Sequence, residues 1–325
     1  MISPYVRRLR LAAELRALRT QAGLTHEQLA KRIGQSRAQI SRLENGHVVD
    51  LDDVMRILDA LEIADDRWTR IMTIAREAGE RGWWESNKAM GERQILYANL
   101  EAGAQTIREF QMTFIPGLLQ TPEFTRARGE ADRLTGRVSY TGDKAAAGRL
   151  GRQRMLRRPG GAEYEVILDE LAIRRAAAPW EVVKAQLYHI AATVNGSPKI
   201  TARVLPIDAR IEGYVVPRSA FSVYTFRDPD DPKVVAVDTV TDDLVLTDIG
   251  EPDDVVRYEE LYERIREASM PMHDSLELLM DVANTPPPPE SAEKVKERRA
   301  RRSAAEPKVA AAAKSSARAA RLAAS

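Results

Sequence analysis

Two short helices joined by a very tight turn are predicted near the start of the chain, and this pair constrains the fold most. Residues 24–46 read LTHEQLAKRIGQSRAQISRLENG. A capping box, in which a hydroxyl residue is followed three positions later by Glu or Gln, occurs twice here. The two predicted boxes are Thr25 with Gln28 and Ser36 with Gln39. Helices over residues 25–33 and 36–45, so close together, must cross steeply, as in a helix-turn-helix.

The second helix of this pair has two dissimilar sides. Ile40 and Leu43 are three residues apart and form its apolar side. At 100° per residue the opposite side carries two arginines and two small residues, namely Arg37, Ala38, Ser41 and Arg42. A solvated face is the simpler reading of such a helix taken alone. The tight turn and the capping boxes favour DNA reading instead, because a solvated face requires neither.

The charge of the chain is unevenly distributed. Residues 1–47 carry nine Lys and Arg against three Glu, and residues 286–325 carry ten against four, so each segment has a net charge of +6. The remainder has a net charge of −11 within a total of +1. Basic ends around an acidic body indicate that a polyanion binds the ends.

The sequence predicts two folded domains. Five short helices over residues 3–79 make an all-α helix-turn-helix domain, and an α+β domain with a mixed or antiparallel sheet follows over residues 82–284. Its expected strands are residues 163–170, 199–207, 219–228, 233–240 and 243–248. Its expected helices are residues 98–111, 144–156, 179–194, 253–269 and 275–283. Residues 286–325 are rich in Pro, Ala, Lys and Arg, and are expected to form a disordered basic tail.

Composition excludes several classes of protein. The chain has no cysteine, so disulfides, thiolate metal sites and cysteine nucleophiles are excluded. No apolar run is long enough for a membrane span, and the N-terminus lacks the apolar core of a signal peptide. The four histidines are scattered without metal-ligand spacing. We therefore expect no metal, no cofactor and no catalytic residues, and a cytoplasmic location on the nucleoid.

Three further clusters have an ordinary structural explanation. The acidic residues 228–231 and 242–243 are expected in solvated turns between strands. Trp83 and Trp84 are expected to anchor the domain junction in the core. The basic run Arg149, Arg152, Arg154, Arg157 and Arg158 fits a solvated helix or an acidic partner at least as well as DNA.

The helix pair, with its G-L-T-x-x-x-L-A and I-S-R-L-E-N-G motifs, resembles the Cro/cI (XRE-type) helix-turn-helix family. The segments GWWE, FIPGLLQTPEFTRA, VILDELAIRR and ITARVLP resemble the C-terminal domain of actinobacterial WhiJ-like, Scr-type antitoxin-like regulators. That domain was long described as one of unknown function. Residues 209–221 depart from that pattern, which usually has a turn with glycine and histidine here.

The resemblance implies roles for individual residues of the helix pair. Arg37, Ala38 and Arg42 align with positions that read base edges, and Ser41 shares their face. Positions near phosphates align with His26, Gln35 and Asn45. A pair that ties the first helix to the end of the third aligns with Arg19 and Glu44. Arginine is suited to reading because it donates two hydrogen bonds to guanine O6 and N7.

Two half-sites about 34 Å apart would place two reading helices in successive major grooves, so we expect a homodimer on double-stranded DNA. The resemblance also implies a small partner protein encoded nearby. The turn FIPGLLQTPEF either folds into the core or lines a groove for that partner. The candidate groove residues are Phe114, Ile115, Pro116, Gly117, Leu118 and Leu119. Other readings stay open: a regulator whose C-terminal domain binds a small molecule, an enzyme with an accessory helical domain, and a structural nucleoid protein.

Overall fold

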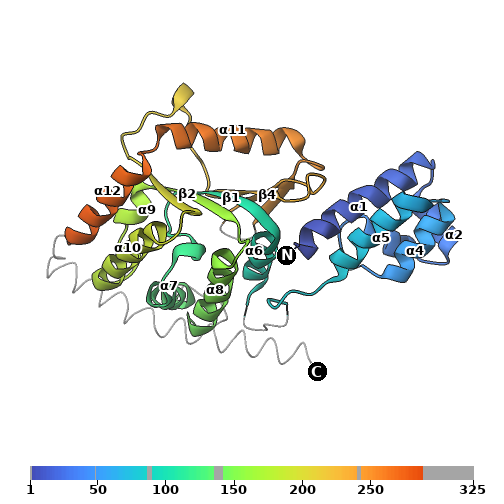
Figure 1. Cartoon of the computed structure of the whole chain (residues 1–325), viewed down its shortest axis with the longest axis horizontal. Coiled ribbons are helices and arrows are strands. Elements are labelled where there is room, and N and C mark those ends of the chain that lie inside the picture. Colours follow the sequence, from blue (N-terminus) through green and yellow to red (C-terminus); the bar gives the residue numbers. More distant parts are fainter. Residues whose placement is uncertain (1, 48, 86–89, 135–141, 240–242, 288–325) are drawn as a thin grey trace.

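A computed structural model of the chain describes residues 2–47, 49–85, 90–134, 142–239 and 243–287. Its N-terminal part is helical, and a mixed α+β domain follows (Figure 1). The predicted fold class is thereby confirmed. The predicted tail, apart from its first two residues, lies outside the described residues. Within the described residues, none of the helices combines the length and apolar character needed to cross a membrane.

The N-terminal helices pack around one apolar core. They are α1 (Pro4–Gln21), α2 (His26–Ile33), α3 (Arg37–Leu43), α4 (Leu51–Ala60) and α5 (Asp65–Gly79). Apolar residues at helical spacing fill this core, for example Leu11, Leu15 and Leu18 from α1. Ile40 and Leu43 contribute from α3 and are 0% and 3% exposed. This burial fixes which side of α3 faces outward.

The second domain is built on a six-stranded sheet with the order β3-β2-β1-β4-β5-β6. The strands are β1 (Ala104–Gln111), β2 (Glu163–Asp169), β3 (Ile200–Leu205), β4 (Phe221–Phe226), β5 (Val234–Val237) and β6 (Leu244–Thr247). Strands β1, β2 and β3 pair in parallel, whereas β1, β4, β5 and β6 pair antiparallel. The sheet is therefore mixed, one of the two arrangements that were predicted.

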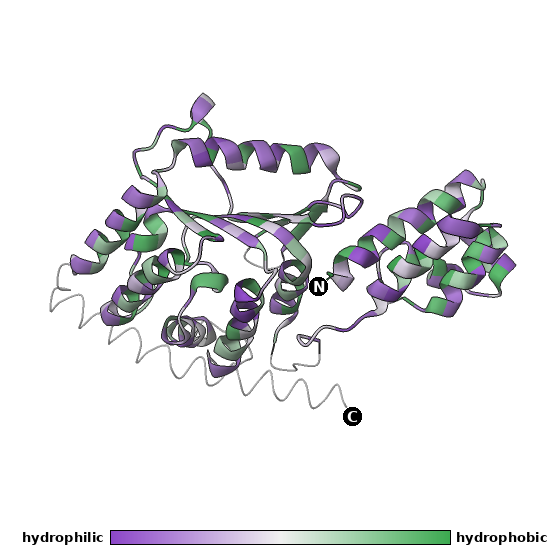
Figure 2. Ribbon diagram, in the orientation of Figure 1, coloured by the Kyte–Doolittle hydropathy of each residue, from purple (hydrophilic) through white to green (hydrophobic). Residues whose placement is uncertain are grey.

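Helices cover both faces of this sheet (Figure 1). Helix α11 (Pro252–Ala268) packs on one face, where Tyr262 and Ile265 join the apolar core. The opposite face carries α6 (Glu92–Gly103), α7 (Pro122–Leu134), α8 (Gly142–Arg157), α9 (Glu170–Arg174), α10 (Trp180–Asn195) and α12 (Met272–Asn284). Figure 2 shows hydrophilic and hydrophobic residues alternating along these helices, as expected when each helix buries one side.

The predicted helix over residues 98–111 is wrong in its second half. Helix α6 ends at Gly103, and the following residues form strand β1, which pairs with β2 and β4. Ala104, Ile107 and Phe110 are spaced three apart and so imitate a helical stripe. Ile107 and Phe110 are instead buried in the cores on opposite faces of the sheet. Pairing on both edges is a tertiary effect that local spacing does not contain.

Two buried arginines join the domains. Arg7 and Arg10 of α1 are 7% and 5% exposed. Their guanidinium groups donate to Asp228 at 2.9 and 2.7 Å, in the loop between β4 and β5. Burial opposes ionisation of Asp228, but these hydrogen bonds outweigh it and lower its pKa to about 2. The expectation of a solvated turn at residues 228–231 is therefore wrong, and both arginines are neutralised within the chain.

The junction also has an apolar part. Val6 of α1 belongs to the core of the second domain and is fully buried. Trp84 is 1% exposed, and its ring meets that of Trp83 edge-on with centroids 5.8 Å apart. Trp84 is buried as predicted, Trp83 is half-buried, and both pack in a cluster with Met90, Ala98 and Met155 of the second domain. Helix α1 therefore contributes to both domains, which ties the orientation of the helical domain to the body.

Candidate DNA-binding surface

The start of α2 forms the capping box that the sequence predicts. The Thr25 hydroxyl accepts from the Gln28 amide at 3.2 Å, and the Gln28 side chain accepts from the Thr25 amide at 2.8 Å. The helix ends at Gly34, whose φ of +69° is a left-handed conformation that favours glycine. This conformation allows the chain to reverse within three residues and begin α3.

The start of α3 is fixed by a carboxylate that the sequence did not reveal. The Ser36 hydroxyl accepts from the Gln39 amide at 3.1 Å, which is half of the second predicted capping box. The other half is wrong, because the Gln39 side chain donates to Asp53 of α4 at 2.9 Å. Gln35 donates to the same carboxylate at 2.6 Å. A hydrogen bond to a carboxylate is stronger than one between neutral groups, so it orients the Gln39 side chain toward α4 rather than back toward the Ser36 backbone.

Asp53 was missed because its sequence context points elsewhere. It stands in the acidic run DLDD, where carboxylates are expected to face solvent and to favour the helix dipole. Asp50 fulfils that expectation and caps α4 through the amide of Asp52. Asp53 is instead 3% exposed. Its position next to Val54, a residue of the apolar side of α4, is the one sequence signal that Asp53 is buried. That position does not identify Gln35 and Gln39 as its partners.

The end of α3 is held by Glu44, which is 2% exposed. Arg19 of α1 donates to both carboxylate oxygens, at 2.6 and 2.8 Å. The His26 ring nitrogen lies 3.0 Å from the same carboxylate, and Arg16 donates to the Glu44 carbonyl at 2.6 Å. Side chains of α1 and α2 thus meet at one residue. We call this group of Arg16, Arg19, His26 and Glu44 the Glu44 clasp.

The outer side of α3 presents two arginines that the fold does not use. Arg37, Ala38 and Arg42 are exposed, and Ser41 is half-buried. Within the described residues, no hydrogen bond or ion pair engages the guanidinium of Arg37 or of Arg42. They contrast with Arg7, Arg10 and Arg19, whose charges are compensated by carboxylates of the chain. Two fork-shaped donors on a helix fixed at both ends can approach a polyanion without rearrangement.

The three residues expected near phosphates each have a hydrogen-bond partner inside the domain. His26 lies against Glu44, and Gln35 donates to Asp53. Asn45 donates to the carbonyl of Ser41 at 2.7 Å and is exposed. These contacts orient the three side chains beside α3. Their contact with phosphates remains a prediction.

The candidate partner groove lies in the core of the second domain. Ile115, Leu118 and Leu119 are at most 3% exposed, and Pro116 is also buried. Gly117 is half-buried, and Phe114 is the exposed member at 44%. Buried amides hold this turn: Gln120 donates to the Ile115 carbonyl, Gln153 to the Gly117 and Gln120 carbonyls, and Gln186 to the Leu119 carbonyl. Burial of most of the segment supports the first of the two readings that the sequence left open, a turn folded into the core.

Comparison with known families covers most of the folded chain. The family model described as the domain of unknown function DUF5753 matches residues 94–281, which is more than half of the sequence. The chain belongs to this family. In this DUF5753 protein a second model, described as a helix-turn-helix domain, matches residues 10–70. That match includes α2, α3 and the Glu44 clasp, and it supports a DNA-binding regulator. Neither the curated proteins nor the solved structures give a match.

Proposed function

We propose that this DUF5753 protein is a sequence-specific transcription regulator that places α3 in the major groove of double-stranded DNA. The observation that carries the proposal is the pair of exposed, uncompensated arginines on a helix held at both ends. Arginine distinguishes guanine through O6 and N7, and the small Ala38 permits close approach to the groove. The helix-turn-helix match supports the same function.

The proposed regulator acts as a homodimer. One helix-turn-helix domain reaches only one half-site, and half-sites one helical turn apart, about 34 Å, place two reading helices in successive major grooves. Because the helix acts on chromosomal DNA, we place the protein on the nucleoid in the cytoplasm. The α+β domain is proposed to have no catalytic role and no cofactor.

For control of the regulator we propose an antitoxin-like arrangement, in which a small protein encoded nearby binds the α+β domain. The support for this arrangement is the resemblance to the WhiJ-like and Scr-type regulators. The turn at residues 114–119 adds no support, because most of it is buried. Co-expression with the neighbouring small protein is expected to give an equimolar complex with altered DNA affinity. Such coupling is reciprocal, so DNA must change the partner's affinity equally. Absence of any complex would favour the alternative, a regulator that binds a small molecule.

The reading role of α3 is tested by two single substitutions. An operator is first selected from random DNA with the intact protein. Arg37→Ala and Arg42→Ala are each expected to weaken operator binding by about 1–3 kcal/mol, because each removes a bidentate contact to a base. Each should also relax the preference at one base pair. Affinities are measured by fluorescence anisotropy at fixed salt, and the preference by repeating the selection with each variant.

Arg67→Ala is the matched control. Arg67 is an exposed arginine of α5, outside the helix pair, so its removal lowers the charge equally without touching α3. It is expected to reduce affinity slightly for all sequences. If all three variants lose the same affinity and keep the original preference, α3 contributes charge alone and does not read the bases.

The basic tail is proposed to strengthen binding without selecting a sequence. It carries ten Lys and Arg against four Glu, and residues 288–325 lie outside the described part of the chain. Cations that neutralise phosphates release counterions, so affinity falls with salt in proportion to their number. Deleting residues 286–325 is expected to lower affinity for every sequence and to flatten the plot of log affinity against log salt. An unchanged slope would show that the tail does not contact DNA.

A further inference from the structure

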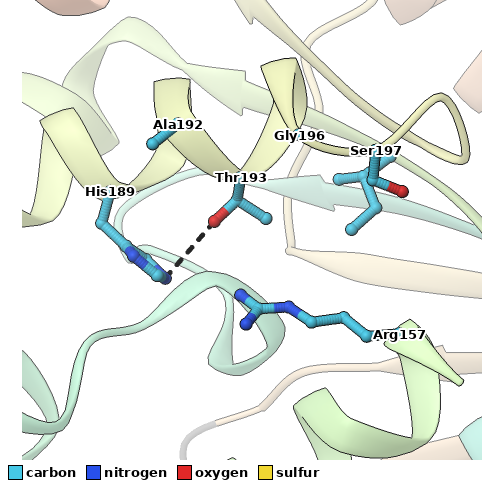
Figure 3. Close-up of a pocket in the computed structure, with 7 residues that line it drawn as sticks. Arg157, His189, Ala192, Thr193, Gly196 and Ser197 are labelled. Atoms are coloured by element: carbon cyan, nitrogen blue, oxygen red, sulfur yellow. Dashed lines mark hydrogen bonds between the residues drawn. The ribbon is translucent and has the colours of Figure 1, made fainter.

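A cleft between α8 and α10 is not used by the proposed DNA contacts. Its volume is about 440 Å³, within the range of small-ligand sites. Arg157 at the end of α8 forms one wall, and His189, Ala192 and Thr193 of α10 form another. Figure 3 shows the guanidinium of Arg157 pointing from α8 toward the side chains of His189 and Thr193.

The Arg157 guanidinium and the His189 imidazole line this cleft, and no acidic side chain is among the lining residues. Burial lowers the pKa of His189, and the nearby charge of Arg157 lowers it further. Within the described residues, Arg157 makes no hydrogen bond or ion pair, and His189 has only a weak contact of 3.4 Å with Thr193. On the same helix the charge of Arg152 is compensated by its ion pair with Glu101.

The rest of the lining suits the body of an organic molecule. Thr193 and Ser197 offer hydroxyl groups, whereas Ala192 and Ile200 offer apolar surface. Backbone carbonyls at the end of α10 would oppose an anion. Those of Ala192 and Val194 are not free, because they accept from the amides of Gly196 and Ser197. The cleft therefore combines donors, hydroxyls and a small apolar wall.

We infer that this cleft binds a small organic anion, with its phosphate or carboxylate held between Arg157 and His189. The guanidinium donates two parallel hydrogen bonds to either anion. An anion between the Arg157 guanidinium and the His189 imidazole offsets the positive charge of Arg157. It therefore favours protonation of His189. The inference supplies a ligand class for the ligand-responsive alternative, but binding itself does not depend on the DNA-binding proposal.

The test follows the His189 imidazole of the full chain by NMR. Glycerol 3-phosphate and butyrate are added separately at matched ionic strength and at several pH values. His189→Gln identifies the signal among the four histidines. The expected result is a saturable movement of the His189 signal and a rise of its pKa with one or both anions. The responding anion identifies the headgroup as phosphate or carboxylate.

Arg157→Ala and Arg154→Ala are compared because both arginines are exposed on the last turns of α8, and Arg154 does not line the cleft. Arg157→Ala is expected to weaken the anion response at least about tenfold, whereas Arg154→Ala leaves it unchanged. Melting curves verify that both variants fold. An equal response in the two variants, or none to either anion in the intact chain, would overturn the inference. Neither the NMR titration nor the melting curves involve DNA, so failure of the operator experiment would not affect this result.

Discussion

Replacing Arg152 with methionine is expected to destabilise the α+β domain by about 3–5 kcal/mol. Arg152 and Glu101 are 8% and 7% exposed, and the guanidinium donates to both carboxylate oxygens at 2.8 and 2.5 Å. The guanidinium also lies over the ring of Tyr97, 5.3 Å from its centroid. Methionine fills much of the same volume but leaves the Glu101 carboxylate buried and unpaired. That uncompensated charge, more than the lost attraction, accounts for the expected loss.

The double variant Arg152→Met, Glu101→Leu separates the cost of the unpaired Glu101 carboxylate from the loss of the attraction between the two side chains. It removes both charges and is expected to be more stable than Arg152→Met alone, because no buried charge remains. Urea unfolding combined with hydrogen exchange locates the loss in the α+β domain, since a chain with two domains need not unfold in one step. A double variant less stable than both single variants would show that the pair itself, rather than the orphaned charge, dominates.

The basic run on α8 shows where sequence reasoning reaches its limit. Its arginines look alike in the sequence, yet Arg152 is buried against Glu101, Arg157 lines a cleft and Arg158 donates to the Ala102 carbonyl at 2.7 Å. Positions on a helix predict which residues share a side. They do not reveal that α6 brings a carboxylate to one of these residues, because α6 lies about fifty positions away. The same holds for Arg7 and Arg10, whose acidic partners are more than 200 residues distant.

The N-terminal domain was predicted more closely because its determinants are local. Caps, a left-handed glycine and apolar spacing lie within a few residues of one another, so α2 and α3 could be placed to within two residues. Strand β1 failed for the opposite reason, since its identity depends on pairing with β2 and β4. The outer face of α3 followed from periodicity, whereas the contact between Asp53 and the two glutamines required the packing of α4.

Replacing Glu44 with alanine is expected to destabilise the helix-turn-helix domain by about 3–5 kcal/mol and to weaken operator binding as well. The substitution leaves Arg19, which is 9% exposed, without its carboxylate partner. It also removes the side-chain contacts that attach the α3 end to α1 and α2, and leaves only the Arg16 hydrogen bond to the backbone carbonyl of residue 44. The exposed arginines of α3 would remain present but would no longer be held in one orientation, and ordering them on DNA then costs conformational entropy.

Glu44→Gln and Arg19→Met, Glu44→Leu distinguish stability from orientation. Glutamine keeps one acceptor oxygen toward Arg19, so a loss of about 1–3 kcal/mol is expected. The double variant removes the buried charges and should recover stability relative to Glu44→Ala, without restoring the attachment of α3. Operator affinity should therefore stay below that of the intact protein in the double variant, even at temperatures where it is fully folded. Full recovery of both properties would mean that the Glu44 clasp stabilises the domain without positioning α3, and that apolar packing through Ile40 and Leu43 alone orients the reading helix.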